Sequence, residues 1–264
     1  ARELKQETGI DTGYRQCGGI YLARGAGEAA SLAGMMKLLG EEGIDCQKLE
    51  PDQLVRYEPH LETLARSGEL RAAYRVAGES QLRNPDHLAA LRVACQQRGV
   101  SIHEQVEVTG FALREGKLLH LEANGQEWPA ESFCIAAGAW TAWMLNQLGI
   151  QNGIFPVRGQ IVMFRCQQPL LTHVVNEGSR YLVPRDDGRL LVGSSEEEVG
   201  FVKATTRRVT EELKKMAREI VPALENSEVE RCWSGLRPGS FDGFPYLGRL
   251  PGVDNAFVAA GHYR

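Results

Sequence analysis

The chain has 264 residues, 43% of them apolar, which is enough for one large or two ordinary domains around a real core. It carries 30 Lys and Arg against 34 Asp and Glu, a net charge of -4, without a block of like charge or a basic stripe. We therefore expect no binding of nucleic acid. No apolar run reaches the length of a membrane span, and the first residues lack the order of a signal peptide, so we expect a cytoplasmic protein.

Helical and strand-like periodicities alternate along the chain, which predicts a mixed α and β fold. Helices are expected over residues 27–40, 85–98 and 205–221. Strands are expected over residues 18–24, 100–105, 117–123, 132–138, 159–165, 180–185 and 189–194. The turn Asp186-Asp187-Gly188 between the last two strands has hairpin chemistry, because Gly and Asp tolerate the positive φ of a tight turn.

The helix expected over residues 85–98 has signals at both ends. Asn84 is a suitable capping residue and Pro85 suits the first helical position. Gly99 is expected to close the helix.

The last letters of the chain hold a cluster of functional groups. A short apolar run over residues 256–260 is typical of a buried strand. It is followed directly by Gly261, His262, Tyr263 and Arg264. A titratable ring, a phenol and a guanidinium at the end of a buried strand indicate a site, and we expect the sequence to be cut through it.

The segment that joins the first expected strand to the first expected helix matches the letters of a dinucleotide-binding motif. Gly25-x-Gly27-x-x-Ala30 opens a helix, and an aspartate follows about 20 residues on. The first strand of that fold is buried on both faces, whereas this one carries Tyr21 and ends in Arg24. We interpret the glycines as a turn into an amphipathic helix.

Six cysteines lie far apart, with no C-x-x-C and no neighbouring His at ligand spacing. We expect reduced, small and mostly buried side chains, and we predict no metal site. Phosphate-binding loops, nucleophile elbows and H-E-x-x-H motifs are also absent from the sequence, which argues against covalent and metal-assisted hydrolysis.

One arginine stands in the Gly- and Pro-rich stretch "WSGLRPGS". Arg237 precedes Pro238, which stiffens the backbone, and we expect turns at Gly235 and Gly239. A guanidinium aimed in this way binds a carboxylate or phosphate through two parallel hydrogen bonds. Tyr181 opens a strand, where its phenol can donate a further hydrogen bond to the same anion. For either residue alone, a surface salt bridge or a half-buried strand tyrosine stays open as the alternative.

Several motifs together carry a resemblance. "YRQCGGIYLA", "CIAAGAWTAWM", "PVRGQIVMFR", "YLVPRDDGRLLVGSS", "WSGLRPGSFDGFPYLG" and "VAAGHYR" resemble glycine oxidases of the thiamine-biosynthesis type, within the D-amino-acid oxidase family of flavoproteins. In that family the chain begins with a G-x-G-x-x-G unit that binds the ADP half of FAD, and it continues beyond "GHYR" into a closing helix. The resemblance therefore predicts an internal fragment of a flavin amine oxidase, or a chain without its ends.

The resemblance also implies roles for single residues. Arg237 matches the arginine that clamps the substrate carboxylate, Tyr181 matches the tyrosine that hydrogen-bonds it, and Arg264 matches a second arginine at the site. The residues implied to contact FAD are Val108, Gly138, Trp140, Gly261, His262 and Tyr263.

The implied reaction is the oxidation of glycine, or a related small amine or amino acid, by hydride transfer from Cα to FAD. It requires positioning of the substrate more than a strong protein base. The imine is then hydrolysed to an oxo acid and ammonia, and dioxygen becomes hydrogen peroxide.

The implied fold is a substrate domain with a large antiparallel sheet and helices, joined to pieces of a Rossmann-like FAD-binding domain. We expect the substrate domain to comprise residues 1–81 and 151–236, and the flavin pieces residues 82–150 and 237–264. Without a pyrophosphate-binding helix the chain is expected to bind FAD poorly. Uncovered apolar surface on the flavin pieces would favour association into a homo-oligomer.

Two alternatives stay open at this point. The nearer one is another member of the family, a sarcosine or D-amino-acid oxidase or dehydrogenase, with a carrier in place of oxygen. The more distant one is an inactive, flavin-free fragment or a binding module.

Overall fold

The computed structural model describes residues 1–263, and the chain divides into two compact units. Unit 1 comprises residues 1–101, 160–195 and 205–233, and unit 2 comprises residues 102–159, 196–204 and 234–264. These boundaries differ in position from those expected from the sequence. Residues 82–101 fall in unit 1, and residues 151–159, 196–204 and 234–236 fall in unit 2. The assignment of substrate and flavin roles to the two parts stays a prediction.

Within residues 1–263, the largest sheet has eight strands in the order β12-β8-β11-β10-β9-β1-β3-β2. The strands are β1 (Gly19–Ala23), β2 (Cys46–Lys48), β3 (Ala72–Val76), β8 (Ile154–Arg165), β9 (Val174–Glu177), β10 (Arg180–Pro184), β11 (Arg189–Gly193) and β12 (Glu228–Ser240). β1 pairs in parallel with β9, whereas the pairs β8–β11, β11–β10, β10–β9, β1–β3 and β3–β2 are antiparallel. The expected large, mainly antiparallel sheet is confirmed.

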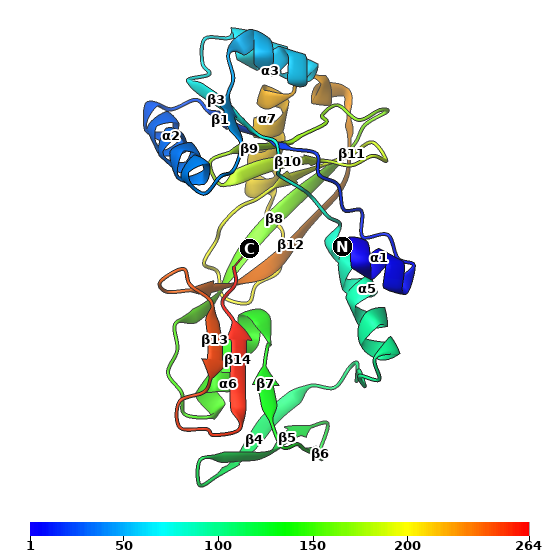
Figure 1. The fold of residues 1–264 in the computed structure, drawn as a ribbon, viewed down its shortest axis with the longest axis vertical. Helices are drawn as coiled ribbons and strands as arrows, with labels where there is room; N and C mark the ends of the chain where they lie inside the picture. The colour runs from blue at the N-terminus through cyan, green and yellow to red at the C-terminus, as the bar shows by residue number, and fades with distance from the viewer. Residues whose placement is uncertain (264) are drawn as a thin grey trace. The chain divides into compact units, whose positions relative to one another are not determined.

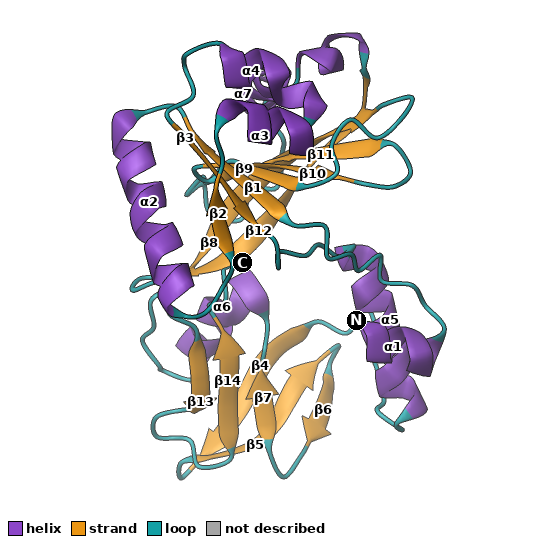
Figure 2. Ribbon diagram, turned by 45° about the horizontal axis from the view of Figure 1, so that its top comes forward, coloured by secondary structure: helices purple, strands orange, loops and turns teal. Residues whose placement is uncertain are grey.

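Helices cover both faces of this sheet in unit 1 (Figure 2). Successive side chains of β1 point to opposite faces of the sheet, so the strand contributes to the packing on both. Ile20 and Leu22 point into a core shared with α3 (Pro51–Tyr57), η1 (Pro59–Leu61), α4 (Glu62–Arg66), α7 (Arg207–Ile220) and η3 (Pro222–Asn226). Tyr21 and Ala23 point to the other face, where α2 (Ala26–Glu41) packs through Leu32 and Met36.

The helices expected from the sequence are present, with one correction. The helices expected over residues 27–40 and 205–221 correspond to α2 and α7. Residues 85–98 correspond to α5 (Asn84–Gln97), which lies against α1 (Arg2–Thr8) and is followed by Gly99 at φ 78°. The expected cap is wrong, because Arg83 occupies the N-cap position without a side-chain hydrogen bond and Asn84 is already helical.

The hairpin expected around Asp186-Asp187-Gly188 is confirmed. β10 and β11 pair antiparallel, with Tyr181 opposite Gly193. Gly188 adopts φ 81°, and the Asp187 carboxylate accepts a hydrogen bond from the Arg189 N–H at 3.1 Å. The turn therefore uses the two residue types that favour it.

Unit 2 contains two three-stranded sheets (Figure 1). One has the order β13-β14-β7, with β7 (Phe133–Ile135), β13 (Tyr246–Arg249) and β14 (Ala256–Ala260). The other has the order β4-β5-β6, with β4 (Val108–Arg114), β5 (Lys117–Ala123) and β6 (Gln126–Pro129). η2 (Gly138–Trp140) and α6 (Thr141–Gln147) follow β7. β5 and β14 have the bounds expected from the sequence.

The strand expected over residues 100–105 is absent from the described fold. Residues 101–103 have no regular structure and Glu104 and Gln105 form a turn, with Gln105 at φ 58°. Val100 and Ile102 are exposed, so the apolar letters that suggested a strand have no partner strand to pack against. Pairing starts only at Val108, where β4 meets β5.

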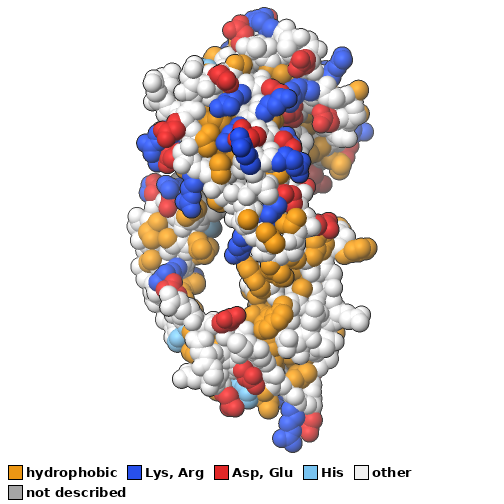
Figure 3. All heavy atoms as spheres, turned by 180° about the vertical axis from the view of Figure 1, so that it is seen from behind, with side chains coloured by type: hydrophobic (Ala, Val, Ile, Leu, Met, Phe, Trp, Pro, Cys, Tyr) orange, Lys and Arg blue, Asp and Glu red, His pale blue; other side chains and the backbone are white. Residues whose placement is uncertain are grey.

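Unit 2 exposes large apolar side chains (Figure 3). Phe241, Phe244 and Leu247 are 89%, 71% and 65% exposed. These three side chains lie within residues 237–264, one of the two expected flavin pieces. That the flavin pieces leave apolar surface uncovered, and that copies associate through it, stay predictions.

All six cysteines are free, with Cys166 buried and Cys134 exposed. Among residues 1–263 no helix combines the length and apolar character needed to cross a membrane. The same residues contain no cluster of three or more His, Cys, Asp or Glu side chains placed to hold a metal ion.

Candidate functional site

Two turns of unit 2 emerge from the same edge of one sheet. β7 and β14 pair in parallel, with Val258 opposite Ile135. Because parallel strands end at a common edge, the turn at η2 and the turn at residues 261–263 both leave the sheet there (Figure 1). The carboxyl edge of parallel strands is where α/β sheets bind ligands.

Glycines shape both turns. Gly138 and Gly261 adopt φ 55° and 79°, in the left-handed region where a glycine has no steric cost. Gly261 is buried. His262, the next residue in its turn, and Trp140, in the turn of Gly138, are exposed. Each turn therefore carries no side chain at its glycine, where the chain leaves the sheet.

Arg237 lies within a strand, which corrects the expected loop. β12 runs unbroken through Gly235, Pro238 and Gly239. Pro238 is compatible with this strand because β12 is the last strand of its sheet, so one side needs no ladder hydrogen bond. The neighbouring strand β8 gives the guanidinium its space: a Cβ built on Gly159 would lie 2.5 Å from both terminal nitrogens of Arg237.

Tyr263 contacts the same guanidinium. The Cζ of Arg237 lies 5.7 Å from the centroid of the Tyr263 ring. Tyr263 has φ 57°, and its backbone N–H donates to the carbonyl of Pro238 at 3.2 Å. The structure therefore joins two residues that the sequence placed in separate roles, one at the substrate and one at the cofactor.

Tyr181 belongs to unit 1, where it opens β10. Its ring lies over Gly193 of β11, since a Cβ built there would be 2.5 Å from the ring carbon that bears the hydroxyl. The glycine thus allows a half-buried phenol to lie across the neighbouring strand. Its expected bond to a substrate stays a prediction.

The remaining expected residues have separate places. Val108 begins β4 in the other sheet of unit 2, paired with Ala123. Arg264 lies outside the described residues. Sequence reasoning did not single out Gly159, although a glycine inside an apolar strand is a signal of close approach by another group.

The glycine pattern around Gly25 does not form a phosphate site. β3 lies between β1 and β2, whereas a dinucleotide-binding unit needs those two strands as neighbours. The carboxylate of Glu28 accepts the Gly25 N–H at 3.0 Å, so an acid already occupies the position of a phosphate oxygen. The glycines make a turn into α2, as interpreted from the sequence.

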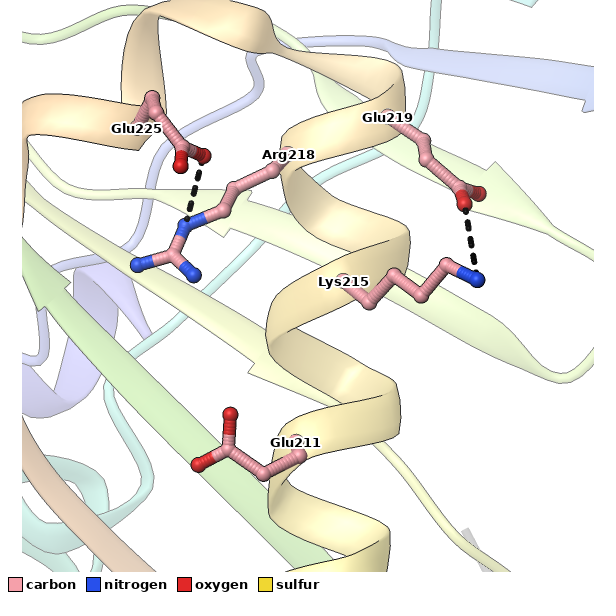
Figure 4. A pocket seen from close by; sticks show the side chains of 5 residues that line it. All are labelled: Glu211, Lys215, Arg218, Glu219 and Glu225. Atoms are coloured by element: carbon pink, nitrogen blue, oxygen red, sulfur yellow. Dashed lines mark ion pairs between the residues drawn. The ribbon is translucent and has the colours of Figure 1, made fainter.

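A shallow pocket on α7 in unit 1 is lined by Glu211, Lys215, Arg218, Glu219 and Glu225 (Figure 4). Its charges compensate one another, with Arg218 3.3 Å from Glu225 and Lys215 3.9 Å from Glu219. The pocket therefore offers no concentrated charge of one sign to a ligand.

A buried ion pair holds residues 196–204 in unit 2. Arg158 pairs with Glu197 at 2.7 Å and donates to the carbonyl of Ala204 at 2.8 Å. Backbone hydrogen bonds between Arg158 and Glu197 add to this attachment. The held segment places Phe201 and Lys203 against Trp140, with a ring separation of 5.6 Å and an ammonium-to-ring distance of 4.7 Å.

Comparison with known proteins adds a family to this geometry. The family model described as FAD dependent oxidoreductase, DAO, matches residues 1–264. The chain belongs to this family. It is 38% identical over 200 residues to a glycine oxidase of Pseudomonas aeruginosa, covering 75% of this chain and 54% of that protein. It is 36% identical over 266 residues to a glycine oxidase of Geobacillus kaustophilus, covering 100% of this chain and 69% of that protein.

A solved structure has the same fold. The crystal structure of glycine oxidase from Geobacillus kaustophilus superposes with a TM-score of 0.93 at 34% identity, over 100% of this chain and 70% of that chain. Against the glycine oxidase of Pseudomonas aeruginosa, the chain spans about half of the relative's length, 54%. The mixed α and β fold expected from the sequence is confirmed.

FAD, the cofactor of the family, fits side chains at the two turns. Thr141 follows η2 directly and is fully buried, and its hydroxyl has no hydrogen-bond partner among the described residues. The buried hydroxyl of Ser240 likewise has none within the described part of the chain. Ser240 adjoins the second turn, since its Cβ is 3.5 Å from a Cβ built on Gly261. Buried polar groups normally have a partner, so these hydroxyls are suited to a polar ligand.

Proposed function

We propose that the protein catalyses the FAD-dependent oxidative deamination of glycine or a related small amino acid. The products are an oxo acid and ammonia, formed by hydrolysis of the imine, and hydrogen peroxide, formed from dioxygen. Membership of the family supports the cofactor, and the glycine oxidases among its relatives support the substrate class.

The observation that carries the proposal is the setting of Arg237. Its guanidinium occupies the space left by Gly159 and lies over the ring of Tyr263, next to the turn predicted to contact the flavin. A guanidinium fork matches the two oxygens of a carboxylate, so Arg237 would hold the carboxylate of the amino acid. We further propose that Tyr181 and Arg264 bind the same substrate, as the family resemblance implies.

The family resemblance, together with the setting of Arg237, supports a role for each of these protein groups. When bound, FAD would supply the acceptor for a hydride from the substrate Cα and the two electrons that reduce dioxygen. Gly138, Trp140 and the turn from Gly261 to Tyr263 would hold its ring, and Val108 would contact it from β4. Arg237 fixes the carboxylate and thereby the direction of the Cα–H bond, which is the contribution that a hydride transfer needs most from the protein.

The proposal is tested by adding glycine anaerobically to the full-length protein and following its visible flavin absorbance. Bleaching is the expected result, and peroxide should appear when air is admitted. A yellow protein that stays yellow with glycine, sarcosine and D-amino acids would contradict the proposed reaction.

The Arg237→Ala variant tests the role of the guanidinium. Loss of a charge-assisted hydrogen bond costs about 1.5–3 kcal/mol, so KM for glycine should rise at least about tenfold while flavin stays bound. The Gly235→Ala variant is the matched control, because a Cβ at that exposed position of the same strand meets no atom within 4 Å. An unchanged KM in Arg237→Ala would remove Arg237 from the site.

A further inference from the structure

We propose that Tyr263 and Gly159 are positioning residues that set the direction of the Arg237 guanidinium toward the substrate carboxylate. The inference rests on the proposed function, because it takes Arg237 as the carboxylate-binding group. It assigns the Tyr263 side chain to the substrate side of the site, whereas the sequence pointed only to a cofactor contact of its turn.

The first support is the absence of a side chain at position 159. Successive residues of a strand point to opposite faces of the sheet, so position 159 faces away from the side chain of Arg158. It faces the guanidinium of Arg237 on the neighbouring strand β12. A methyl group there would lie 2.5 Å from both terminal nitrogens of Arg237. Carbon and nitrogen atoms do not approach so closely without a bond, so an alanine would displace the guanidinium from its place.

The second support is the constrained backbone of Tyr263. A tyrosine at φ 57° adopts a conformation that non-glycine residues seldom take. Its N–H bonds to the carbonyl of Pro238, the residue next to Arg237 in β12. The turn is thereby tied to the strand beside the arginine, and the ring is brought over the guanidinium.

The third support is the nature of the ring contact. An aromatic face attracts a cation through its quadrupole, at distances up to about 6 Å. The ring carries no charge, so it orients the guanidinium without neutralising it, in contrast to the carboxylate that Glu197 places 2.7 Å from Arg158. The ring contact therefore bears on the direction of the guanidinium through its quadrupole and not through an opposite charge.

The test measures binding of acetate, a carboxylate without an amine to oxidise, to the full-length protein loaded with FAD. Acetate affinity is followed by the change in flavin absorbance and by competition with glycine. Tyr263→Leu should weaken acetate binding by about three- to tenfold, the effect of losing a cation–π contact, and Tyr263→Phe should stay within about twofold of wild type. Gly159→Ala should weaken acetate binding at least as much as Tyr263→Leu, while Gly235→Ala should leave it unchanged.

Flavin content and the glycine kcat separate positioning from general damage. A positioning role raises KM and the acetate dissociation constant in Tyr263→Leu, with flavin content kept. If Tyr263→Leu also loses flavin, Gly159→Ala decides, since the three atoms nearest to its methyl all belong to the Arg237 guanidinium.

Three results would overturn the inference. They are unchanged acetate binding in Tyr263→Leu, unchanged binding in Gly159→Ala, and an equal loss in Tyr263→Phe and Tyr263→Leu, which would make the hydroxyl the active group. If the wild-type protein bleaches with glycine and all four variants bind acetate as the wild type does, this inference alone is refuted. A wild-type protein that responds to neither glycine nor acetate would refute the proposed function itself.

Discussion

A buried glutamate in unit 1 gives a sharp test of how the helical layer is tied to the sheet. Glu58 lies between α3 and η1, and its side chain is 1% exposed. One of its oxygens, Oε1, accepts from the backbone N–H of Thr172 at 2.8 Å and of His173 at 2.6 Å. The same oxygen lies 2.6 Å from the Thr172 hydroxyl and 2.7 Å from the His173 Nδ1. We predict that removing this acceptor destabilises unit 1 strongly.

The magnitude follows from the exposure of the donors. His173 is buried, so Glu58→Ala leaves its backbone N–H without this acceptor, at a cost of about 1–3 kcal/mol. Its Nδ1 keeps the Thr172 hydroxyl at 2.9 Å but loses the charged partner, which adds to the cost. Thr172 is exposed, so water replaces much of what it loses. The expected loss of unfolding free energy is about 2–5 kcal/mol. Glu58→Gln keeps an oxygen in place and loses only the charge, so it should cost roughly 1–2 kcal/mol.

The assay is urea denaturation of the full-length protein, followed by circular dichroism. Glu62→Ala is the matched control, because this neighbouring glutamate of α4 is exposed and forms a surface ion pair with Arg66 at 3.0 Å. Its effect should stay within about 0.5 kcal/mol, as for surface substitutions in general. If Glu58→Ala costs no more than Glu62→Ala, the reasoning from the buried acceptor is wrong.

Two further predictions concern charged pairs. Arg189 first, and then Arg165, hold the pKa of Glu230 below its ordinary value of 4.5 through hydrogen bonds. A carboxyl with a lowered folded-state pKa contributes stability above its unfolded pKa and loses it as pH falls through the folded value. The stability gap between wild type and Glu230→Gln should therefore be present above pH 4.5 and close as the pH is lowered below it. A gap in urea midpoints that stays constant as the pH falls would contradict this prediction. Arg158→Met removes the ion-pair partner of Glu197 and the hydrogen-bond donor to the Ala204 carbonyl, so trypsin should cleave after Lys203 several times faster than in wild type. Mass spectrometry of the tryptic fragments measures this rate. An unchanged cleavage pattern would show that the ion pair does not hold residues 196–204.

The elements that the sequence predicted well are those whose own pattern decides their structure. β5 and β14 have the expected bounds because each alternates or concentrates apolar residues between turn residues. α7 matches within two residues at each end, since its buried side chains recur at helical spacing and pack against the sheet. In these segments local pattern and tertiary packing agree.

The errors lie where pairing with a distant strand decides. "WSGLRPGS" has the letters of a turn, yet β12 stays extended because it pairs along β8 and its outer edge accepts a proline. Residues 100–105 have the letters of a strand but no partner. Glu58 meets Thr172 across 114 positions of sequence, a separation at which a single sequence carries no signal.

Two arginines of unit 2 show why a candidate site needs coordinates as well as motifs. Both stand between glycine and proline letters, Arg158 in "PVRGQ" and Arg237 in "GLRPG". The structure uses Arg158 to hold its own chain, since the guanidinium is buried against Glu197 and the carbonyl of Ala204. Arg237 lies instead where a glycine leaves room and a neutral ring supports its charge. The same type of side chain therefore holds a distant segment of its own chain in one strand, and lies against a glycine and an aromatic ring in the next. The residues that face each strand make the difference.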